Sequence, residues 1–223
     1  MYKRQVLGYK GSTFLTASVG TDLSHSAGPD ATAPELAFAF WQRVLAWTAT
    51  HNDGADGPGY ATLDGTLRGF SSSGDGLRET AMLQASFRLP PGITTAEVAS
   101  GVAELALQDN VQLTWQPNAE AFRVDKRSPL VAPFMAGIRA AGGQPRIKVK
   151  TGTADMNLVG PQWGCPIIAY GPGDASFDHR PDEQISVAEL DHGVDVLAAA
   201  LPRIAQLLLR QREQSATGEG SRA

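Results

Sequence analysis

Two helix-start signals, each placed between strand-like segments, constrain the fold of this chain most strongly. Thr32-Ala33-Pro34-Glu35 and Thr94-Thr95-Ala96-Glu97 are capping boxes, in which the threonine hydroxyl accepts from a backbone amide and the glutamate reaches back. Strand patterns precede, separate and follow them, at residues 6–19, 60–70, 77–89 and 111–115. The order strand, helix, strand, strand, helix, strand predicts a ferredoxin-like split βαβ unit, a four-stranded antiparallel sheet with two helices on one face.

The second half of the chain alternates strand and helix patterns, which is typical of an α/β sheet. Helices are expected at 129–141, at 156–163 and from a third capping box at Ser186, with short strands at 146–150 and 166–170. The predicted class is therefore α/β with an α+β first domain. We expect domains at 6–116 and 117–212 and a disordered polar tail at 213–223, and we exclude residues 1–5 from the fold as a reading-frame remnant.

Composition narrows the classes of partner. The 223 residues are 42% apolar and carry a formal net charge of −4 with scattered Lys and Arg, so we expect neither nucleic acid nor an anionic membrane as partner. No apolar run is expected to reach the roughly 20 residues of a membrane span, and a cytoplasmic location is expected. The single Cys165 excludes an internal disulfide and is interpreted as a small buried hydrophobe.

Three loop motifs carry a family resemblance. They are Asp178-His179-Arg180-Pro181-Asp182-Glu183 after a Gly-Pro-Gly turn, Lys150 to Asn157, and Ser24 to Pro29. With them the chain resembles, over residues 6 to 211, the dinuclear-zinc amidohydrolases and peptidases that include acetylornithine deacetylase and succinyl-diaminopimelate desuccinylase. Within this family it is most similar to hydrolases that free lysine or ornithine from an amino-group carrier protein.

The resemblance implies a zinc site with two ions, or cobalt in their place, and makes His179 a ligand to one of them. Asp178 and Asp182 would then orient the imidazole ring. Without the resemblance, a surface or capping histidine is the better interpretation of His179. One imidazole cannot hold a catalytic zinc, which needs about three protein ligands. We therefore expect the family's His-x-Asp and Glu-Glu segments to lie outside this chain, which would be an inactive C-terminal fragment.

Further site residues follow from the same resemblance. His25 would reach across a lid-mediated homodimer to stabilise the oxyanion in the partner's site; the alternative is a loop histidine bonded to Ser24 or Ser26. Arg88, at the end of a lid strand, can grip a substrate carboxylate with two parallel hydrogen bonds, or it covers the lid edge. Gly152 and Thr153 form a strand-to-helix turn that faces an anionic group or is purely structural.

Lys150-Thr151-Gly152 also matches a motif of serine β-lactamases, which require an upstream Ser-x-x-Lys that this sequence lacks. The preferred function is metal-dependent hydrolysis of an amide or isopeptide bond on the α-amine of an amino acid. The substrate would be carrier-linked lysine or ornithine, or N-acetylornithine. The alternative is a non-catalytic dimerisation or binding module.

Overall fold

The computed structural model describes residues 2–25, 28–54, 59–174, 177 and 179–219. The chain divides into two compact units. The lid unit comprises Tyr9–Phe122 and Lys150–Pro161, and the second unit comprises the remaining described residues. Each unit is described by itself below.

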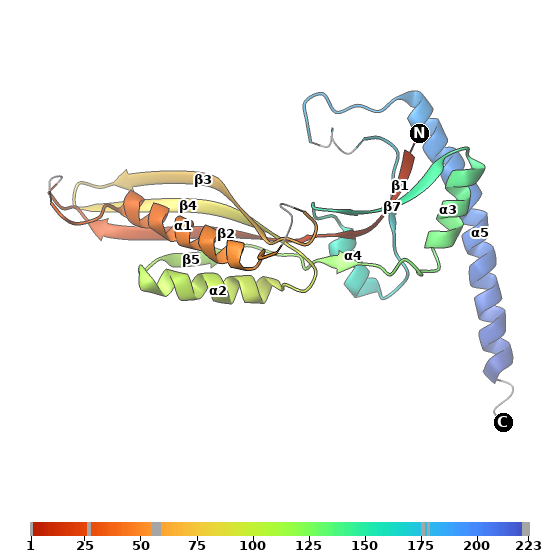
Figure 1. The fold of residues 1–223 in the computed structure, drawn as a ribbon, viewed down its shortest axis with the longest axis horizontal. Helices are drawn as coiled ribbons and strands as arrows, with labels where there is room; N and C mark the ends of the chain where they lie inside the picture. Colours follow the sequence, from red (N-terminus) through yellow and green to blue (C-terminus); the bar gives the residue numbers. More distant parts are fainter. Residues whose placement is uncertain (1, 26–27, 55–58, 175–176, 178, 220–223) are drawn as a thin grey trace. The chain divides into compact units, whose positions relative to one another are not determined.

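The lid unit has the expected split βαβ plan. Its strands are β2 (Gly11–Asp22), β3 (Asp64–Gly74), β4 (Arg78–Leu89) and β5 (Gln112–Trp115), and its helices are α1 (Ala33–Thr50) and α2 (Thr95–Gln108). The sheet order is β3-β4-β2-β5, and every adjacent pair is antiparallel. Both helices pack on one face of this sheet (Figure 1). The prediction of a ferredoxin-like unit is thus confirmed.

Both capping boxes predicted in the lid unit form. The Thr32 backbone N–H donates to Glu35 Oε2 at 2.8 Å, and the Thr94 N–H donates to Glu97 Oε2 at 2.6 Å. In return, each threonine hydroxyl accepts from the glutamate's backbone amide. The backbone hydrogen bonds from the threonines lower the pKa of Glu35 and Glu97, so both carboxylates stay charged at neutral pH near the positive helix end.

The two faces of the lid sheet differ sharply. Its inner face packs Leu15, Ala17 and Val19 of β2, with alternate residues of β4, against Phe40 and Val102 of the helices. Because side chains alternate along a strand, the residues between these core positions lie on the other face. Most are uncharged polar side chains, with the exposed apolar residues Phe14 and Met82 among them and two arginines near one end: Ser12, Phe14, Thr16, Ser18, Thr66, Arg68, Thr80, Met82, Gln84, Ser86, Arg88, Gln112 and Thr114.

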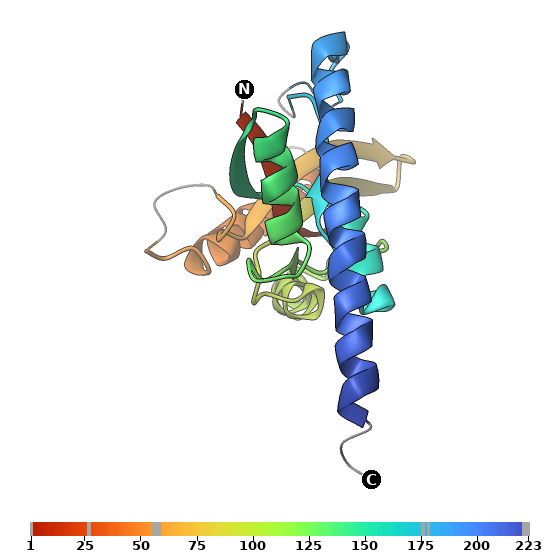
Figure 2. The ribbon, with the colours of Figure 1, turned by 90° about the vertical axis from the view of Figure 1, so that its right-hand side faces the viewer.

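The second unit is a mixed α/β structure. Its strands are β1 (Tyr2–Tyr9), β6 (Phe122–Arg123), β7 (Gln144–Lys150) and β8 (Ala169–Tyr170), in the order β6-β1-β7 with β8 also paired to β1. Helices α3 (Val131–Ala140) and α5 (Val187–Glu219) lie side by side (Figure 2). They meet through Phe134, Ile138, Val196 and Ala200. The remaining helix, α4 (Met156–Trp163), begins in the lid unit.

Several boundaries differ from the sequence expectation. Residues 2–5, excluded above, belong to strand β1, where buried Gln5 donates from Nε2 to the Val131 carbonyl at 3.3 Å. The strand expected at 6–19, with a break in the Lys10-Gly11-Ser12 region, is two strands that belong mainly to different units and are separated at Lys10. Helix α5 runs to Glu219, where a disordered tail was expected from residue 213. Cys165 is exposed, which contradicts its interpretation as a buried hydrophobe.

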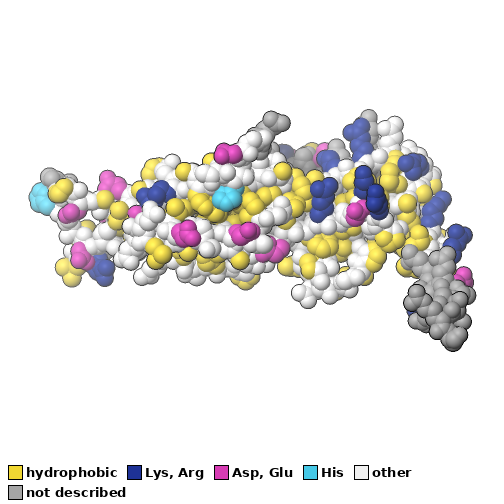
Figure 3. Space-filling view, turned by 60° about the horizontal axis from the view of Figure 1, so that its bottom comes forward, with side chains coloured by type: hydrophobic (Ala, Val, Ile, Leu, Met, Phe, Trp, Pro, Cys, Tyr) yellow, Lys and Arg dark blue, Asp and Glu magenta, His cyan; other side chains and the backbone are white. Residues whose placement is uncertain are grey.

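The expectation that no apolar run reaches the length of a membrane span is contradicted. By length and composition, Val187–Arg210 of α5 is apolar enough to cross a membrane, although a soluble core helix passes the same test. Asp195 and Arg203 interrupt this stretch, and Val196 and Ala200 within it are buried against α3. On the face of the lid unit seen in Figure 3, charged side chains stand singly among apolar and uncharged ones.

Candidate functional site

Lys10 is fully buried at one end of the lid unit, where it is the centre of a hydrogen-bond network. Its Nζ donates to the Gly59 carbonyl at 3.0 Å and also to the Thr62 carbonyl and the Asp64 carboxylate. Asp64, whose side chain is 34% exposed, accepts a further hydrogen bond from the Thr62 hydroxyl at 2.9 Å. A lysine is almost never fully buried without such partners. Lys10 therefore fixes the start of β3 against the start of β2.

The backbone of Lys10 holds the turn between β7 and α4. Its N–H donates to the Lys150 carbonyl at 3.2 Å, and its carbonyl accepts from Thr153 Oγ1 at 2.9 Å and from Asn157 Nδ2 at 3.1 Å. Asn157 is 3% exposed and also bonds the Glu120 carbonyl and the Ala154 amide. The side chain of Asn157 thus fixes the 150–157 turn on β2.

This turn meets Arg88, which stands near the end of β4 opposite Ser12 of β2. Arg88 NH1 donates to Thr153 Oγ1 at 2.7 Å, across 65 residues of sequence. The single hydroxyl proton of Thr153 is given to the Lys10 carbonyl, so Arg88 uses an oxygen lone pair. The structure joins two of the residues expected at the site. The Thr153 hydroxyl is thus bonded on both sides within the fold, and the binding role predicted for Thr153 stays a prediction.

Arg88 has a second cation beside it. Arg68 Nε donates at 2.9 Å to the hydroxyl of Ser86, and Ser86 lies two residues before Arg88 on β4. Burial, and then the like charge of Arg68, lower the pKa of Arg88, which remains protonated at neutral pH because its ordinary value is so high. In the described part of the chain, no carboxylate forms an ion pair with either arginine. The arrangement favours a bound anion.

Gly152 lies in the same turn and is exposed. A Cβ added to Gly152 would meet no atom within 4 Å, so the fold does not require glycine there and the space beside the turn is open. An open turn next to a partly buried guanidinium suits a ligand. The binding role predicted for Gly152 stays a prediction.

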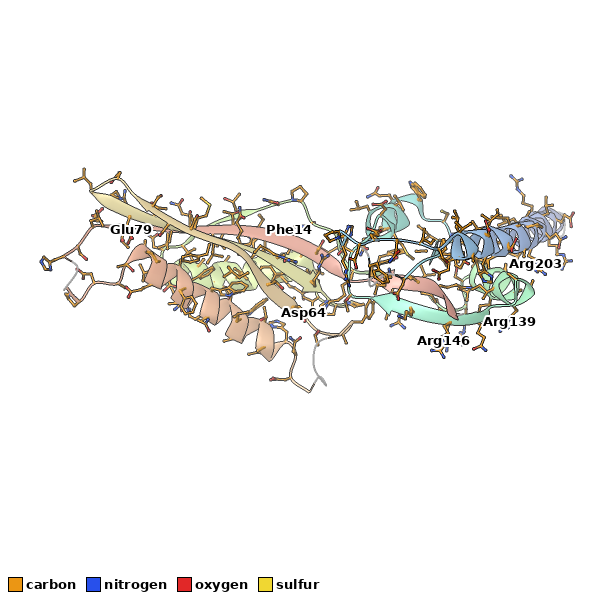
Figure 4. The ribbon with its side chains drawn as sticks, turned by 90° about the horizontal axis from the view of Figure 1, so that it is seen from above. Phe14, Asp64, Glu79, Arg139, Arg146 and Arg203 are labelled. Carbon is orange, nitrogen blue, oxygen red and sulfur yellow. The ribbon has the colours of Figure 1, made fainter. Side chains whose placement is uncertain are left out.

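His25 lies at the opposite end of the lid sheet. It is exposed in the loop after β2, where the Leu23 amide donates to the Leu77 carbonyl at 2.8 Å. The strand from Gly11 to Asp22 spans eleven rises, or about 36 Å. Glu79 and Asp64 mark the two ends in Figure 4. Within one chain, His25 and Arg88 are therefore not brought together. Ser26, a suggested partner of His25, lies outside the described residues.

His179, the expected metal ligand, is an exposed residue of the second unit with a left-handed φ of 63°. Its backbone N–H donates to Glu183 Oε2 at 3.1 Å. Asp182, expected to orient the ring, accepts two hydrogen bonds from Arg180 instead, and Asp178 lies outside the described residues. Among the described residues, no three His, Cys, Asp or Glu side chains form a group that could hold a metal. These residues do not fit a complete zinc site, so we derive no catalytic step through a metal.

One triplet with His-x-Asp spacing does occur, His51-Asn52-Asp53, contrary to the expectation that this pattern lies outside the chain. His51 ends helix α1, with its Nδ1 3.0 Å from the Trp47 carbonyl and its ring centroid 4.3 Å from that of Trp47. Asn52 exchanges two hydrogen bonds with the backbone of Leu63. The contacts of His51 and Asn52 stabilise the loop between α1 and β3, so both residues have a structural role there.

Comparison with known proteins gives a consistent family. Residues 10–203 match the model of peptidase family M20/M25/M40. The chain is 37% identical over 200 residues to a [LysW]-lysine hydrolase of Deinococcus radiodurans. This match covers 89% of this chain and 55% of that protein. It is 37% identical over 71 residues to a [LysW]-lysine/[LysW]-ornithine hydrolase of Sulfurisphaera tokodaii, covering 32% and 20%. The chain thus spans about half the length of the first relative.

Solved structures show the same fold at low sequence identity. An M20 family metallo-carboxypeptidase from Sulfolobus solfataricus superposes with a TM-score of 0.69 at 14% identity, covering 89% of this chain and 60% of that one. The aminopeptidase PepT from Bacillus cereus gives 0.65 at 15% identity, covering 92% and 54%. Both likenesses support the α/β fold class.

Proposed function

The chain belongs to peptidase family M20/M25/M40, and from this premise we propose that it supplies the substrate-binding and dimer-forming part of a metal-dependent hydrolase. The reaction is cleavage of an amide or isopeptide bond on the α-amine of an amino acid. Carrier-linked lysine or ornithine is the preferred substrate, because the relatives named above are [LysW]-lysine and [LysW]-ornithine hydrolases. N-acetylornithine is the alternative substrate.

The observation that carries this proposal is Arg88 held by Thr153 beside an open turn. An amino acid acylated on its α-amine keeps its α-carboxylate, and a guanidinium binds a carboxylate through two parallel hydrogen bonds. NH1 of Arg88 is oriented by Thr153, which limits the side-chain freedom lost on binding. In this proposal Arg88 binds the α-carboxylate and Thr153 positions Arg88.

In the proposed active site, this chain supplies only some of the catalytic groups. His179 contributes one zinc or cobalt ligand, and the other ligands and the general base come from the family's His-x-Asp and Glu-Glu segments, which we propose lie outside this sequence. The oxyanion donor is His25 of a second copy, brought in by dimerisation of the lid units. The chain by itself then acts as a binding and dimerisation module without turnover. We place the enzyme in the cytoplasm, with neither nucleic acid nor membrane as a partner.

Binding of Nα-acetyl-L-lysine to the purified chain tests the role of Arg88. The variant Arg88→Gln is expected to weaken binding roughly tenfold to hundredfold in calorimetric titration, the worth of a hydrogen bond to a charged group. Arg78→Gln, at the far end of the same strand and paired with Asp22, is the matched control and should bind normally. Equal affinity for N-acetyl-L-lysine amide, which lacks the carboxylate, would contradict the proposal.

A further inference from the structure

The hairpin between β3 and β4 carries a carboxylate at the His25 end of the lid sheet. Asp75 stands in this hairpin, and the carbonyl of Leu77, two residues further on, accepts from the Leu23 amide at 2.8 Å. Leu23 in turn precedes His25 by two residues, so this bond joins the hairpin to the loop that carries His25. Asp75 and His25 therefore share one end of the sheet, and Arg88 lies at the other.

Asp75 is a preorganised acceptor with one oxygen to spare. Its Oδ1 accepts from the backbone amides of Arg78 at 2.7 Å and Leu77 at 2.8 Å. These two hydrogen bonds, from Arg78 first, lower the pKa of Asp75, so the carboxylate is charged at neutral pH. In the part of the chain that the structure describes, Oδ2 accepts from no other residue.

A hollow of about 460 Å³ opens beside Asp75 on the outer face of the sheet. Most of its lining is uncharged and able to form hydrogen bonds, with Ser18, Ser73, Thr80, Asn110 and Gln112 among the lining residues. Among the described residues that line it, Asp75 is the one acidic side chain, and Arg78, the one basic side chain, forms its ion pair with Asp22. Pockets of a few hundred Å³ typically bind small molecules. The uncommitted charge in this hollow is negative and suits a cation.

The substrates of the proposed function share a cation that has no partner so far. Lysine, ornithine and N-acetylornithine all carry an ammonium group at the end of the side chain. Arg88 binds the α-carboxylate in the proposed function and His25 stabilises the oxyanion, so neither contacts this ammonium. A charged group that leaves water without a counter-charge is costly to bind. A carboxylate that enters the site together with His25 removes this cost.

We propose that Asp75 of one copy binds the side-chain ammonium of the amino acid whose α-carboxylate is held by Arg88 of the other copy. This inference rests on the proposed function, in which His25 enters the site of a second copy. Asp75 enters with it, because the two loops are bonded to each other. Oδ2 of Asp75 accepts from the ammonium while Oδ1 stays on the hairpin amides. Asp75 thereby selects lysine and ornithine over amino acids with neutral side chains.

The test compares Nα-acetyl-L-lysine with Nα-acetyl-L-norleucine, which keeps the four-carbon side chain and lacks the ammonium. Calorimetry uses the purified chain at a concentration at which sedimentation shows a dimer. The wild-type dimer is expected to bind the lysine compound about tenfold more tightly, the worth of a hydrogen bond between two charged groups. Asp75→Asn is expected to abolish this preference and leave affinity for the norleucine compound unchanged.

Two controls make the comparison specific. Asparagine keeps a side-chain oxygen for the hairpin amides, so Asp75→Asn removes the charge and preserves the turn. Glu104→Gln removes the same charge from the exposed side of α2 and should retain the tenfold preference. Thermal melting of each variant establishes that it is folded.

The outcomes separate this inference from the proposed function. Equal affinity for the two compounds in the wild-type dimer, or a preference that survives Asp75→Asn, overturns the role of Asp75 and leaves the role of Arg88 standing. A preference shown by the monomeric chain also overturns it, because Asp75 and Arg88 lie at opposite ends of one sheet. If the wild-type chain forms no dimer or binds neither compound, the proposed function fails, and the role of Asp75 fails with it.

Discussion

In an active enzyme that contains this sequence, His25→Ala is expected to lower kcat by about 10²- to 10³-fold and to leave zinc content unchanged. This is the typical loss when one preorganised oxyanion donor is removed. His25 is exposed beyond β2, about 36 Å along the strand from the Arg88 end, so the proposed function assigns its target to a second copy. Steady-state kinetics with metal analysis measures both quantities. Ser24→Ala, in the same loop, is the matched control and should retain full turnover.

Mixing two inactive variants tests whether the site is shared between subunits. In a dimer of His25→Ala with Arg88→Ala, one site carries both defects and the other carries neither. With random exchange, half of the dimers are mixed, so roughly a quarter of wild-type activity should return. No recovery, with subunit exchange demonstrated, would contradict a shared site. Loss of zinc in His25→Ala would assign this histidine to the metal centre instead.

Replacing Lys10 by methionine is expected to lower the free energy of unfolding by about 3 kcal/mol. Removing one partner of a buried ion pair usually costs roughly 3 to 5 kcal/mol, because the other charge is left without compensation. Asp64 is one-third exposed, so water relieves part of this penalty and the lower end applies. The carbonyls of Gly59 and Thr62 also lose their donor. Urea denaturation followed by circular dichroism measures the change.

The control for Lys10→Met is Lys126→Met, an exposed lysine whose loss should change stability by less than about 0.5 kcal/mol. A double-mutant cycle with Asp64→Asn should give a coupling energy of at least about 1 kcal/mol, since the two side chains are in direct contact. Additive effects of the two substitutions would show that Lys10 stabilises the fold only through backbone carbonyls.

Local signals predicted the lid unit well. Each capping box depends on atoms within four residues, so Thr32 with Glu35 and Thr94 with Glu97 could be assigned without tertiary information. The change of unit between Gly8 and Tyr9 was not predictable in this way. Strands β1 and β2 read as one broken strand because their separation depends on partners far along the chain, including Lys150.

The candidate site shows the same limit. Arg88 and Thr153 were selected from motifs, but their contact depends on the Lys10 carbonyl and on Asn157, neither of which had an assigned role. Both bond mainly to backbone carbonyls, and such partners leave no residue pattern in a sequence. Arg68 escaped notice because the β-bulge between Leu67 and Gly69 of β3 appears only once the strands are paired. For Asn157, its place in the Lys150 to Asn157 motif was the only signal available.

The proposal that this chain binds substrate but supplies only one metal ligand, His179, is tested most directly by the zinc content of the purified chain. After dialysis against buffer containing equimolar zinc, metal analysis is expected to find well below one tightly bound ion per chain. The reason is that His179 stands without a set of three ligands among the described residues, and catalytic zinc needs about three. One or two tightly bound ions per chain, together with release of lysine from an Nα-acyl-lysine, would contradict the account.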